Sequence, residues 1–250
     1  MNQDSISKAA ALLVAARRTR QPIDRLPDDC RPATLDDALR IQAASVDQMG
    51  ERIAGWKVGG LIEGRLSYGV LLASRIVPSG GRVDARDIAL LGMEAEVGFR
   101  FVRDAPPRAA AYSYDEVAER LVAFPAIEIV ATRYRDYQGT AVIERIADCM
   151  SNGAYVVGPD HPAWRAVDLA NLDVTLTFGE RVVVQRRGGH PAGDPVKPAV
   201  DLVNALRTST GVRAGQLMTT GTYTGLNFAT PGQRIAAVFD GFGRADVDIG

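Results

Sequence analysis

The chain has 250 residues, a formal net charge of −1, and 46% hydrophobic and 24% charged residues. These values are typical of a globular domain and give no reason to expect a nucleic acid or an anionic membrane as a partner. Its two cysteines, Cys30 and Cys149, match no metal-binding or redox spacing, so we expect both to be reduced and buried. No apolar run is long enough to span a bilayer, and the charges around Ala9–Ala16 are in the wrong order for a signal peptide. We therefore expect a cytoplasmic protein.

Residues 1–52 predict a helical segment that packs on the rest of the chain. One amphipathic helix is expected over residues 5–20, with Asp4 or Ser5 as its N-cap. A second helix follows Thr34, which is a typical N-cap residue. Neither helix carries obvious chemistry, so we expect a cap on the core or an oligomer contact.

Residues 53–250 are expected to form one core domain of short strands separated by glycine and proline. Many irregularly spaced strands with few helices favour an α+β fold, in which a mixed β-sheet closes into a roll or barrel. Strands are expected near residues 54–58, 68–72, 75–77, 82–84, 92–101, 126–131, 154–157, 173–178, 181–187, 217–219, 234–239 and 245–249. Helices are expected near residues 114–121, 145–148 and 199–210.

The strand Gly92–Phe101 alternates apolar residues with Glu94 and Glu96, which must therefore point to the same face. A solvent-exposed strand face is the plain interpretation of this pair. However, Glu128 lies in the middle of Phe124–Ala131, which is apolar on both faces, and a lone buried carboxylate is costly unless it is paired or binds a metal. Three carboxylates without a nearby histidine or cysteine suit Mg²⁺ or Mn²⁺ and do not suit zinc.

A single lysine, Lys57, interrupts the apolar strand Gly55–Gly60. Its side chain either extends to solvent or places a buried ammonium beside a substrate carboxylate or enolate. In the second case it supplies charge or a proton.

Two polar turns follow strands or helices later in the chain. The segment Ala147–Ala154 predicts a helix end that runs into a turn, and its polar residues serve either capping or a site. The segment Thr219–Gly225 is rich in hydroxyls and glycine, and such a turn is suited to holding a carboxylate through backbone N–H groups. His161 and His190 each precede a proline and are expected to be loop residues without a catalytic role.

In their order and spacing, these segments resemble the 2-keto-4-pentenoate hydratase and 4-oxalocrotonate decarboxylase branch of the fumarylacetoacetate hydrolase superfamily. The resemblance runs through nearly the whole chain. It is carried by Gly55-Trp56-Lys57-Val58-Gly59, Tyr68-Gly69-Val70-Leu71, Glu94-Ala95-Glu96, Ala126-Ile127-Glu128, Ala147-Asp148, Ser151-Asn152-Gly153, Gly189-His190-Pro191 and Thr220-Gly221-Thr222.

The resemblance implies a fumarylacetoacetate hydrolase-like catalytic domain over residues 53–250, in which a mixed sheet surrounds a divalent-metal site. It implies that this site is formed by three ligands of Mg²⁺ or Mn²⁺, namely Glu94, Glu96 and Glu128. Lys57 matches the active-site lysine of such proteins, and Ser151 and Asn152 match a polar segment that lines the site. It also implies a homo-oligomer, which in a catabolic pathway is expected to associate with an aldolase or decarboxylase.

The substrate-binding residues are expected around the polar turns. Thr222 and Thr224 are predicted to receive the substrate carboxylate. Ser67 stands where similar proteins often carry Asp, and Cys149 stands where many carry Asn. Both departures remove a polar group near the expected substrate pocket and therefore bear on the choice of substrate.

The implied activity is metal-dependent hydration of a 2-hydroxypenta-2,4-dienoate-type 2-keto acid to 4-hydroxy-2-oxopentanoate, in the catabolism of aromatic compounds after meta cleavage. Decarboxylation of 4-oxalocrotonate is the alternative, because it needs the same enolate and no added water. A non-catalytic partner subunit of such an enzyme is a further alternative, in which the departures at Ser67 and Cys149 have disabled the site.

Overall fold

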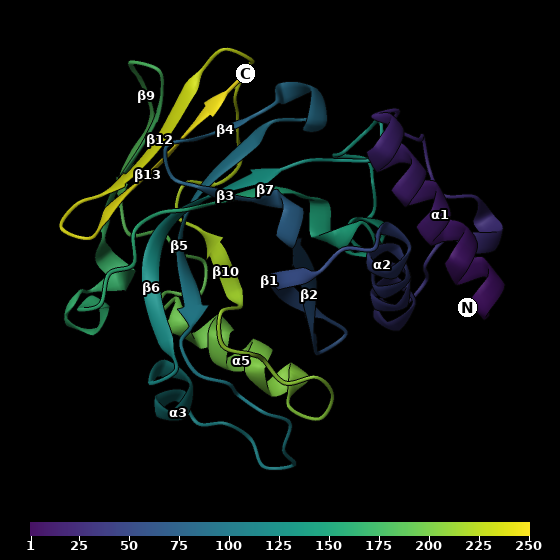
Figure 1. Ribbon diagram of the computed structural model, residues 1–250, viewed down its shortest axis with the longest axis horizontal. Coiled ribbons are helices and arrows are strands. Elements are labelled where there is room, and N and C mark those ends of the chain that lie inside the picture. The colour runs from purple at the N-terminus through teal and green to yellow at the C-terminus, as the bar shows by residue number, and fades with distance from the viewer.

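The computed structural model describes residues 1–250. Two helices, α1 (Gln3–Thr19) and α2 (Leu35–Met49), pack against each other at one end of the molecule (Figure 1). The N-cap of α1 is Asn2, whose side chain accepts a hydrogen bond from the Ser5 amide at 2.8 Å, so the predicted caps Asp4 and Ser5 were wrong. Thr34 caps α2 as predicted. Their shared apolar side also packs on α4 (Val142–Ala147), which joins the helical segment to the core domain.

The larger sheet has eight strands in the order β2-β1-β10-β5-β6-β7-β3, with β11 paired to β5. Its β1–β10 and β3–β7 pairs are parallel and its other pairs are antiparallel, so the sheet is mixed. The strands are β1 (Ile53–Ile62), β2 (Arg65–Leu72), β3 (Ile76–Pro78), β5 (Gly92–Phe101), β6 (Leu121–Val130), β7 (Asn152–Val157), β10 (Leu217–Thr222) and β11 (Asn227–Phe228).

The smaller sheet has five strands in the order β4-β13-β12-β8-β9. Strands β8 and β9 form one antiparallel hairpin, and β12 and β13 form another. The strands are β4 (Gly81–Val83), β8 (Asp173–Phe178), β9 (Arg181–Arg187), β12 (Arg234–Phe239) and β13 (Gly243–Ile249).

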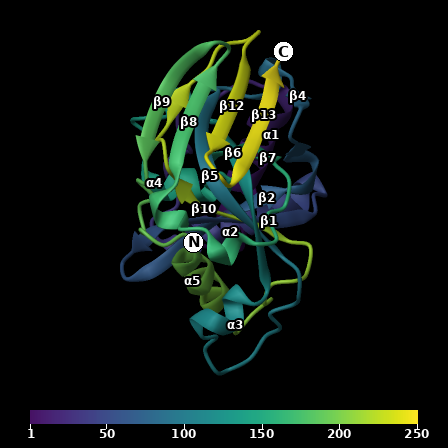
Figure 2. The same ribbon diagram turned by 90° about the vertical axis from the view of Figure 1, so that its left-hand side faces the viewer.

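The two sheets share one hydrophobic core, and β5 and β6 run behind the smaller sheet in the turned view (Figure 2). Ala95 and Val97 of β5 enter this core from one side, and Ile235 and Val247 enter it from the other. Two further helices, α3 (Tyr114–Ala118) and α5 (Val196–Leu206), lie at the lower end of the sheets. The architecture is the predicted α+β fold with mixed sheets.

Most element boundaries differ from the predictions by a few residues, and one difference matters for the site. Strand β6 begins at Leu121, whereas the prediction began it after Pro125. The full register from Phe101↔Leu121 to Gly92↔Val130 keeps Pro125 inside the strand, opposite Val97. Cross-strand pairing thus outweighs the tendency of proline to be excluded from the interior of a strand.

Both cysteines are free and buried, as expected. The structure contains no helix of the length and apolarity that a membrane crossing requires.

Candidate active site

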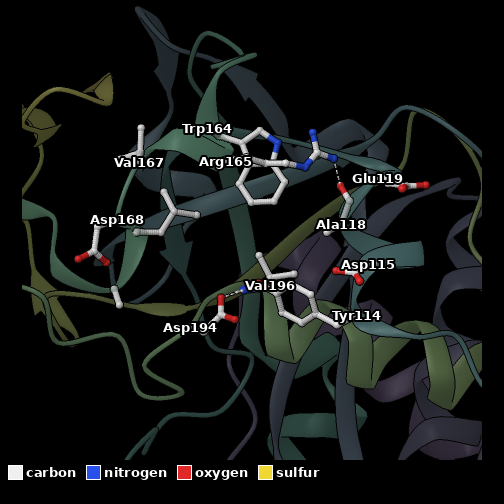
Figure 3. Close-up of a pocket in the computed structure, with 12 residues that line it drawn as sticks. Tyr114, Asp115, Ala118, Glu119, Trp164, Arg165, Val167, Asp168, Asp194 and Val196 are labelled. Atoms are coloured by element: carbon white, nitrogen blue, oxygen red, sulfur yellow. Dashed lines mark hydrogen bonds between the residues drawn. The ribbon is translucent and has the colours of Figure 1, made fainter.

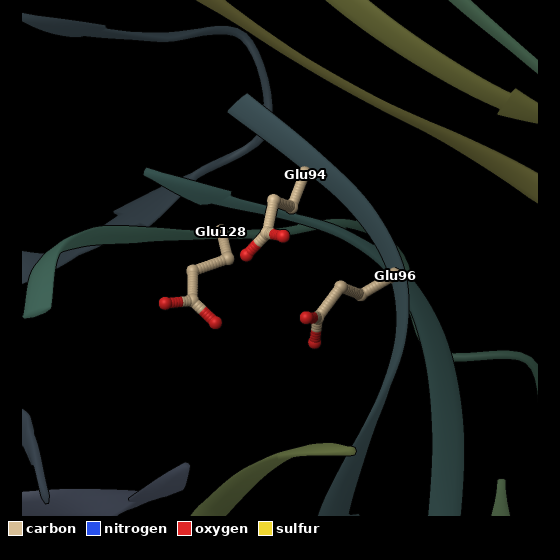
Figure 4. A group of neighbouring side chains, drawn as sticks. All are labelled: Glu94, Glu96 and Glu128. Carbon is tan, nitrogen blue, oxygen red and sulfur yellow. The ribbon is translucent and has the colours of Figure 1, made fainter. Parts of the chain in front are cut away.

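Three glutamates converge on one face of the larger sheet (Figure 4). Glu94 of β5 lies directly opposite Glu128 of β6, and Glu96 follows two residues later on the same face. One carboxylate oxygen of each lies within 4.8 Å of the other two. Glu96 is only 2% exposed and Glu94 is partly buried, so the interpretation of this pair as a solvent-exposed strand face was wrong, whereas Glu128 is buried as expected.

The burial of this cluster shifts the proton equilibria of its members. Burial, and then the charge of Glu128, raise the pKa of Glu94 to about 7. Burial and the charges of Glu128 and Glu94 raise the pKa of Glu96 well above its ordinary value. Both shifts mean that the ionised cluster is unstable without a compensating cation.

The nearest positive charge is Lys57 of β1, whose ammonium forms an ion pair with Glu128 and donates a hydrogen bond to the Met150 carbonyl at 2.6 Å. The lysine is 5% exposed, so its side chain does not extend to solvent. When ionised, three carboxylates beside one ammonium leave an excess of two negative charges, which a divalent cation neutralises. The oxygen-only donor set fits a hard ion such as Mg²⁺ or Mn²⁺.

Thr219 of β10 belongs to the same cluster and was not singled out from the sequence. Its hydroxyl donates a hydrogen bond to Glu96 Oε2 and lies 3.4 Å from Glu128 Oε2. The parallel register Lys57↔Thr219 between β1 and β10 places it there. Only this long-range pairing distinguishes Thr219 from its hydroxyl neighbours in the chain.

Of the predicted substrate-binding residues, Thr222 ends β10 just after an irregularity in its pairing with β5, and Thr224 follows the strand. The Thr224 hydroxyl accepts a hydrogen bond from the Ala95 amide at 3.0 Å, and the Thr222 hydroxyl donates to the Ala95 carbonyl at 3.4 Å. Since Ala95 separates Glu94 from Glu96, both threonines anchor the backbone that carries two carboxylates. Their contact with a substrate stays a prediction.

Asn152 is fully buried, and neither polar atom of its side-chain amide has a hydrogen-bond partner in the chain. It pairs with Val130 of β6, two residues after Glu128, and therefore shares the sheet face of the glutamates. A buried amide without a partner is costly, which suits a site where a ligand supplies the missing bonds. Ser151 is buried beside it, and its carbonyl accepts a hydrogen bond from the Ala131 amide at 2.9 Å.

Ser67 and Cys149 are both buried, and each contacts different residues. The Ser67 hydroxyl donates a hydrogen bond to the Gly60 carbonyl at 2.7 Å. Cys149 lines a narrow cleft together with Leu13 and Met49 of the N-terminal helices. His190, expected to be a loop residue without a catalytic role, lies in the loop after β9 and is buried beside Thr220, not beside the glutamates.

A surface cavity of about 650 Å³ lies between α3, the segment 164–170 and the start of α5 (Figure 3). Its lining includes Trp164, Arg165 and four carboxylates, but none of the three glutamates or Lys57. Arg165 donates a hydrogen bond to the Ala118 carbonyl, and Asp194 accepts one from the Val196 amide at 2.9 Å. Because the glutamates and Lys57 do not line this cavity, its size does not make it the candidate active site.

No family model matches the chain. A 2-keto-4-pentenoate hydratase of Paraburkholderia phymatum is 28% identical to it, with 88% of each chain covered. A 4-oxalocrotonate decarboxylase of a Pseudomonas species is 26% identical, with 80% of this chain and 83% of the relative covered. The solved structure of the 4-oxalocrotonate decarboxylase from Pseudomonas putida, complexed with magnesium and adipate, has a TM-score of 0.87 at 22% identity. It covers 100% of this chain and 99% of that chain.

These comparisons confirm the resemblance expected from the sequence. The chain has the fumarylacetoacetate hydrolase-like fold. Within that fold it is similar to the 2-keto-4-pentenoate hydratases, four of which are 26–28% identical over most of their length.

Proposed function

We propose that the protein is a divalent-metal-dependent hydratase, a carbon–oxygen lyase that adds water to a 2-hydroxypenta-2,4-dienoate-type 2-keto acid and yields 4-hydroxy-2-oxopentanoate. The observation that carries this proposal is the convergence of Glu94, Glu96 and Glu128 with Lys57 on one buried sheet face. Similarity to the hydratases along nearly the whole chain supports the choice of substrate class.

Glu94, Glu96 and Glu128 would hold Mg²⁺ or Mn²⁺. A bound divalent ion supplies Lewis acidity, which stabilises negative charge on the 2-oxo oxygen of a keto acid. The burial of the cluster supports this role, because buried carboxylates of one sign need a cation near them.

The remaining groups of the site bind and position the substrate. Lys57 stabilises negative charge or transfers a proton, and its low exposure keeps bulk water from competing for that proton. The amide of Asn152 offers one donor side and one acceptor side to a ligand on the face of Glu128. Thr219 orients Glu96 through its hydroxyl. The substrate carboxylate is assigned to the segment Thr220–Thr224.

Decarboxylation of 4-oxalocrotonate is the second candidate. It needs stabilisation of the same enolate by the same groups, and it breaks a carbon–carbon bond to CO₂ where the hydratase adds water. The relative named 4-oxalocrotonate decarboxylase, 26% identical to this chain, favours keeping this candidate.

One experiment separates these functions. Purified protein is incubated with 2-hydroxypenta-2,4-dienoate and, separately, with 2-oxo-3-hexenedioate, each with Mg²⁺ or with a chelator. Metal-dependent loss of ultraviolet absorbance without CO₂ is the expected result for the first substrate. Release of CO₂ from the second substrate alone would replace the hydratase by the decarboxylase. No turnover of either substrate by metal-loaded protein would favour the non-catalytic partner subunit.

A further inference from the structure

The turn Cys149–Met150–Ser151 has an unusual backbone. These three consecutive residues have φ values of 51°, 49° and 60°, all in the left-handed region, and none of them is glycine. A residue other than glycine is strained in this region, so the surrounding structure must stabilise the turn. Such strain is concentrated at functional sites in proteins.

A buried ionic network surrounds both ends of this turn. Arg133 donates hydrogen bonds from Nε to both carboxylate oxygens of Asp148, at 2.6 and 2.7 Å, and from Nη2 to the Asp148 carbonyl at 3.2 Å. It also donates from Nη1 to the Asn152 carbonyl at 3.1 Å. Asp148 precedes the turn and Asn152 follows it, so one guanidinium clamps both ends.

The helix α1 contributes a second guanidinium to the same clamp. Arg17 donates a hydrogen bond to the Asn152 carbonyl at 3.0 Å, and its Nη2 lies 3.6 Å from Asp148 Oδ1. Its side chain is only 11% exposed. Burial and the charge of Arg133 lower the pKa of Arg17 to about 10, which leaves the group charged at neutral pH. Arg17 and Arg133 thus contact the same two partners, the Asp148 carboxylate and the Asn152 carbonyl.

The clamped turn delivers two groups to the site. Its middle residue presents the Met150 carbonyl to the Lys57 ammonium at 2.6 Å. Its side chain covers β1 and β2, where a Cβ added to Gly59 or Gly69 would come within 2.6 or 2.4 Å of Met150 atoms. The residue after the turn is Asn152, whose unpartnered amide shares the face of the glutamates.

We propose that Arg17 is a positioning residue of the active site: with Arg133 and Asp148 it holds the left-handed turn that fixes Lys57 and Asn152 relative to the three glutamates. The inference rests on the proposed function for its kinetic consequence. It gives the N-terminal helix a role in turnover, although α1 itself contributes no group to the glutamate cluster.

The test is a double-mutant cycle on metal-loaded, full-length protein with 2-hydroxypenta-2,4-dienoate. Arg17→Met alone should lower kcat by about 10- to 100-fold, the scale expected when a catalytic group is misplaced. In the background of Lys57→Ala the same change should lower kcat by a clearly smaller factor than in the wild type, because Lys57 is already absent and only Asn152 is left to be misplaced. Arg18→Met on the same helix, at an exposed side chain bonded only to the Gln48 carbonyl, is the matched control and should leave kcat unchanged.

Equal losses of kcat in the two backgrounds would overturn the proposal, since Arg17 would then act independently of Lys57. A loss that disappears when rates are expressed per folded molecule would do the same. If Arg17→Met does not fold, Arg17→Lys replaces it in the cycle, because lysine keeps the charge but lacks the planar fork that reaches two acceptors.

Hydrogen exchange separates this inference from the proposed function. The Ser151 amide donates to the Asp148 carbonyl at 2.9 Å within the turn. Its exchange should be at least about tenfold faster in Arg17→Met than in the wild type, because a weakened clamp lets the turn open. Unchanged exchange would refute the clamp even if the hydratase activity is found. Faster exchange in a protein without turnover would support the clamp and reject the hydratase function.

Discussion

At the scale of single residues, the site depends on charges that the fold removes from water. Lys57 shows this most clearly, because its ammonium contacts Glu128 and the Met150 carbonyl with almost no exposure to solvent. A buried ammonium beside carboxylates stabilises their ionised forms and is available for proton transfer. His190 is also buried, but it lies away from the glutamates, so its protonation can be followed separately through the pH dependence of stability.

Replacing Lys57 by alanine should lower kcat by roughly 10²–10⁴-fold, which is the usual contribution of a general acid or base. Binding of Mn²⁺, measured by calorimetry, should be largely retained because the three carboxylates remain. Lys8→Ala, at an exposed lysine, is the control for the loss of a positive charge. Full turnover by the Lys57→Ala variant would show that the lysine has no catalytic role.

Burial lowers the pKa of His190 to about 4 from its ordinary value of 6.5. Between these two pH values the unfolded chain binds a proton that the folded protein does not, so the free energy of unfolding falls as the pH drops through this window. The shift corresponds to roughly 3 kcal/mol.

We therefore expect His190→Gln to flatten the dependence of stability on pH between 4 and 6.5, as measured by urea denaturation. His161→Gln changes the other histidine of the chain and should retain the wild-type dependence. The same slope for wild type and His190→Gln would mean that other groups cause the acid sensitivity.

At the scale of elements, the spacing of Glu94 and Glu96 depends on the contact between β5 and residues 222–224, at the end of β10 and just after it. The Thr224 hydroxyl is the acceptor for the amide of Ala95, between two of the glutamates. The hydroxyls of residues 222 and 224 are thus part of the connection that sets the spacing of Glu94 and Glu96. This connection depends on pairing with a strand far away in the chain.

Thr224→Val should destabilise the protein by about 1–3 kcal/mol, because it leaves the buried Ala95 amide without an acceptor. Thr224→Ser keeps the hydroxyl and should recover most of that loss. Chemical denaturation of both variants measures the difference. Equal stability of the valine and serine variants would show that the methyl group, not the hydroxyl, is the important part.

At the scale of the whole molecule, the two sheets share one core, so a metal that binds the glutamates of β5 and β6 would be coupled to the unfolding of both sheets. A ligand that binds only the folded state raises the free energy of unfolding of the protein, and at concentrations well above Kd this increase grows with the logarithm of the ligand concentration. The expected homo-oligomeric assembly stays a prediction, to be measured by light scattering.

Mg²⁺ or Mn²⁺ at about 100 times its Kd should raise the free energy of unfolding by about 2.7 kcal/mol relative to chelated protein. For a chain of this size that corresponds to an increase in Tm of roughly 5–10 °C, measured by calorimetry. Glu128→Gln should abolish the increase, whereas Glu180→Gln, in an exposed turn, should retain it. The same increase in the Glu128→Gln variant would place the metal elsewhere.

Local patterns in the sequence were sufficient for the orientation of the glutamates and for all the strands except β11, although most strand boundaries differed by a few residues. Residues two apart in a strand share a face whatever the fold, which is why Gly92–Phe101 was predicted with its observed bounds and with Glu94 and Glu96 together. The apolar surroundings of Glu128 likewise predicted its burial. Resemblance to relatives then predicted the fold and the class of substrate.

Neighbour relations between distant segments depended on the tertiary structure alone. The parallel pairing of β1 with β10 brings Thr219 beside Lys57, and no periodicity within either strand encodes that register. The packing of α1 places Arg17 on the turn that follows Asp148, although the helix pattern of α1 shows only which face is apolar. The physical reason is that strand pairing and buried ion pairs are contacts between segments far apart in the chain, whereas amphipathic periodicity records only the burial of each segment by itself.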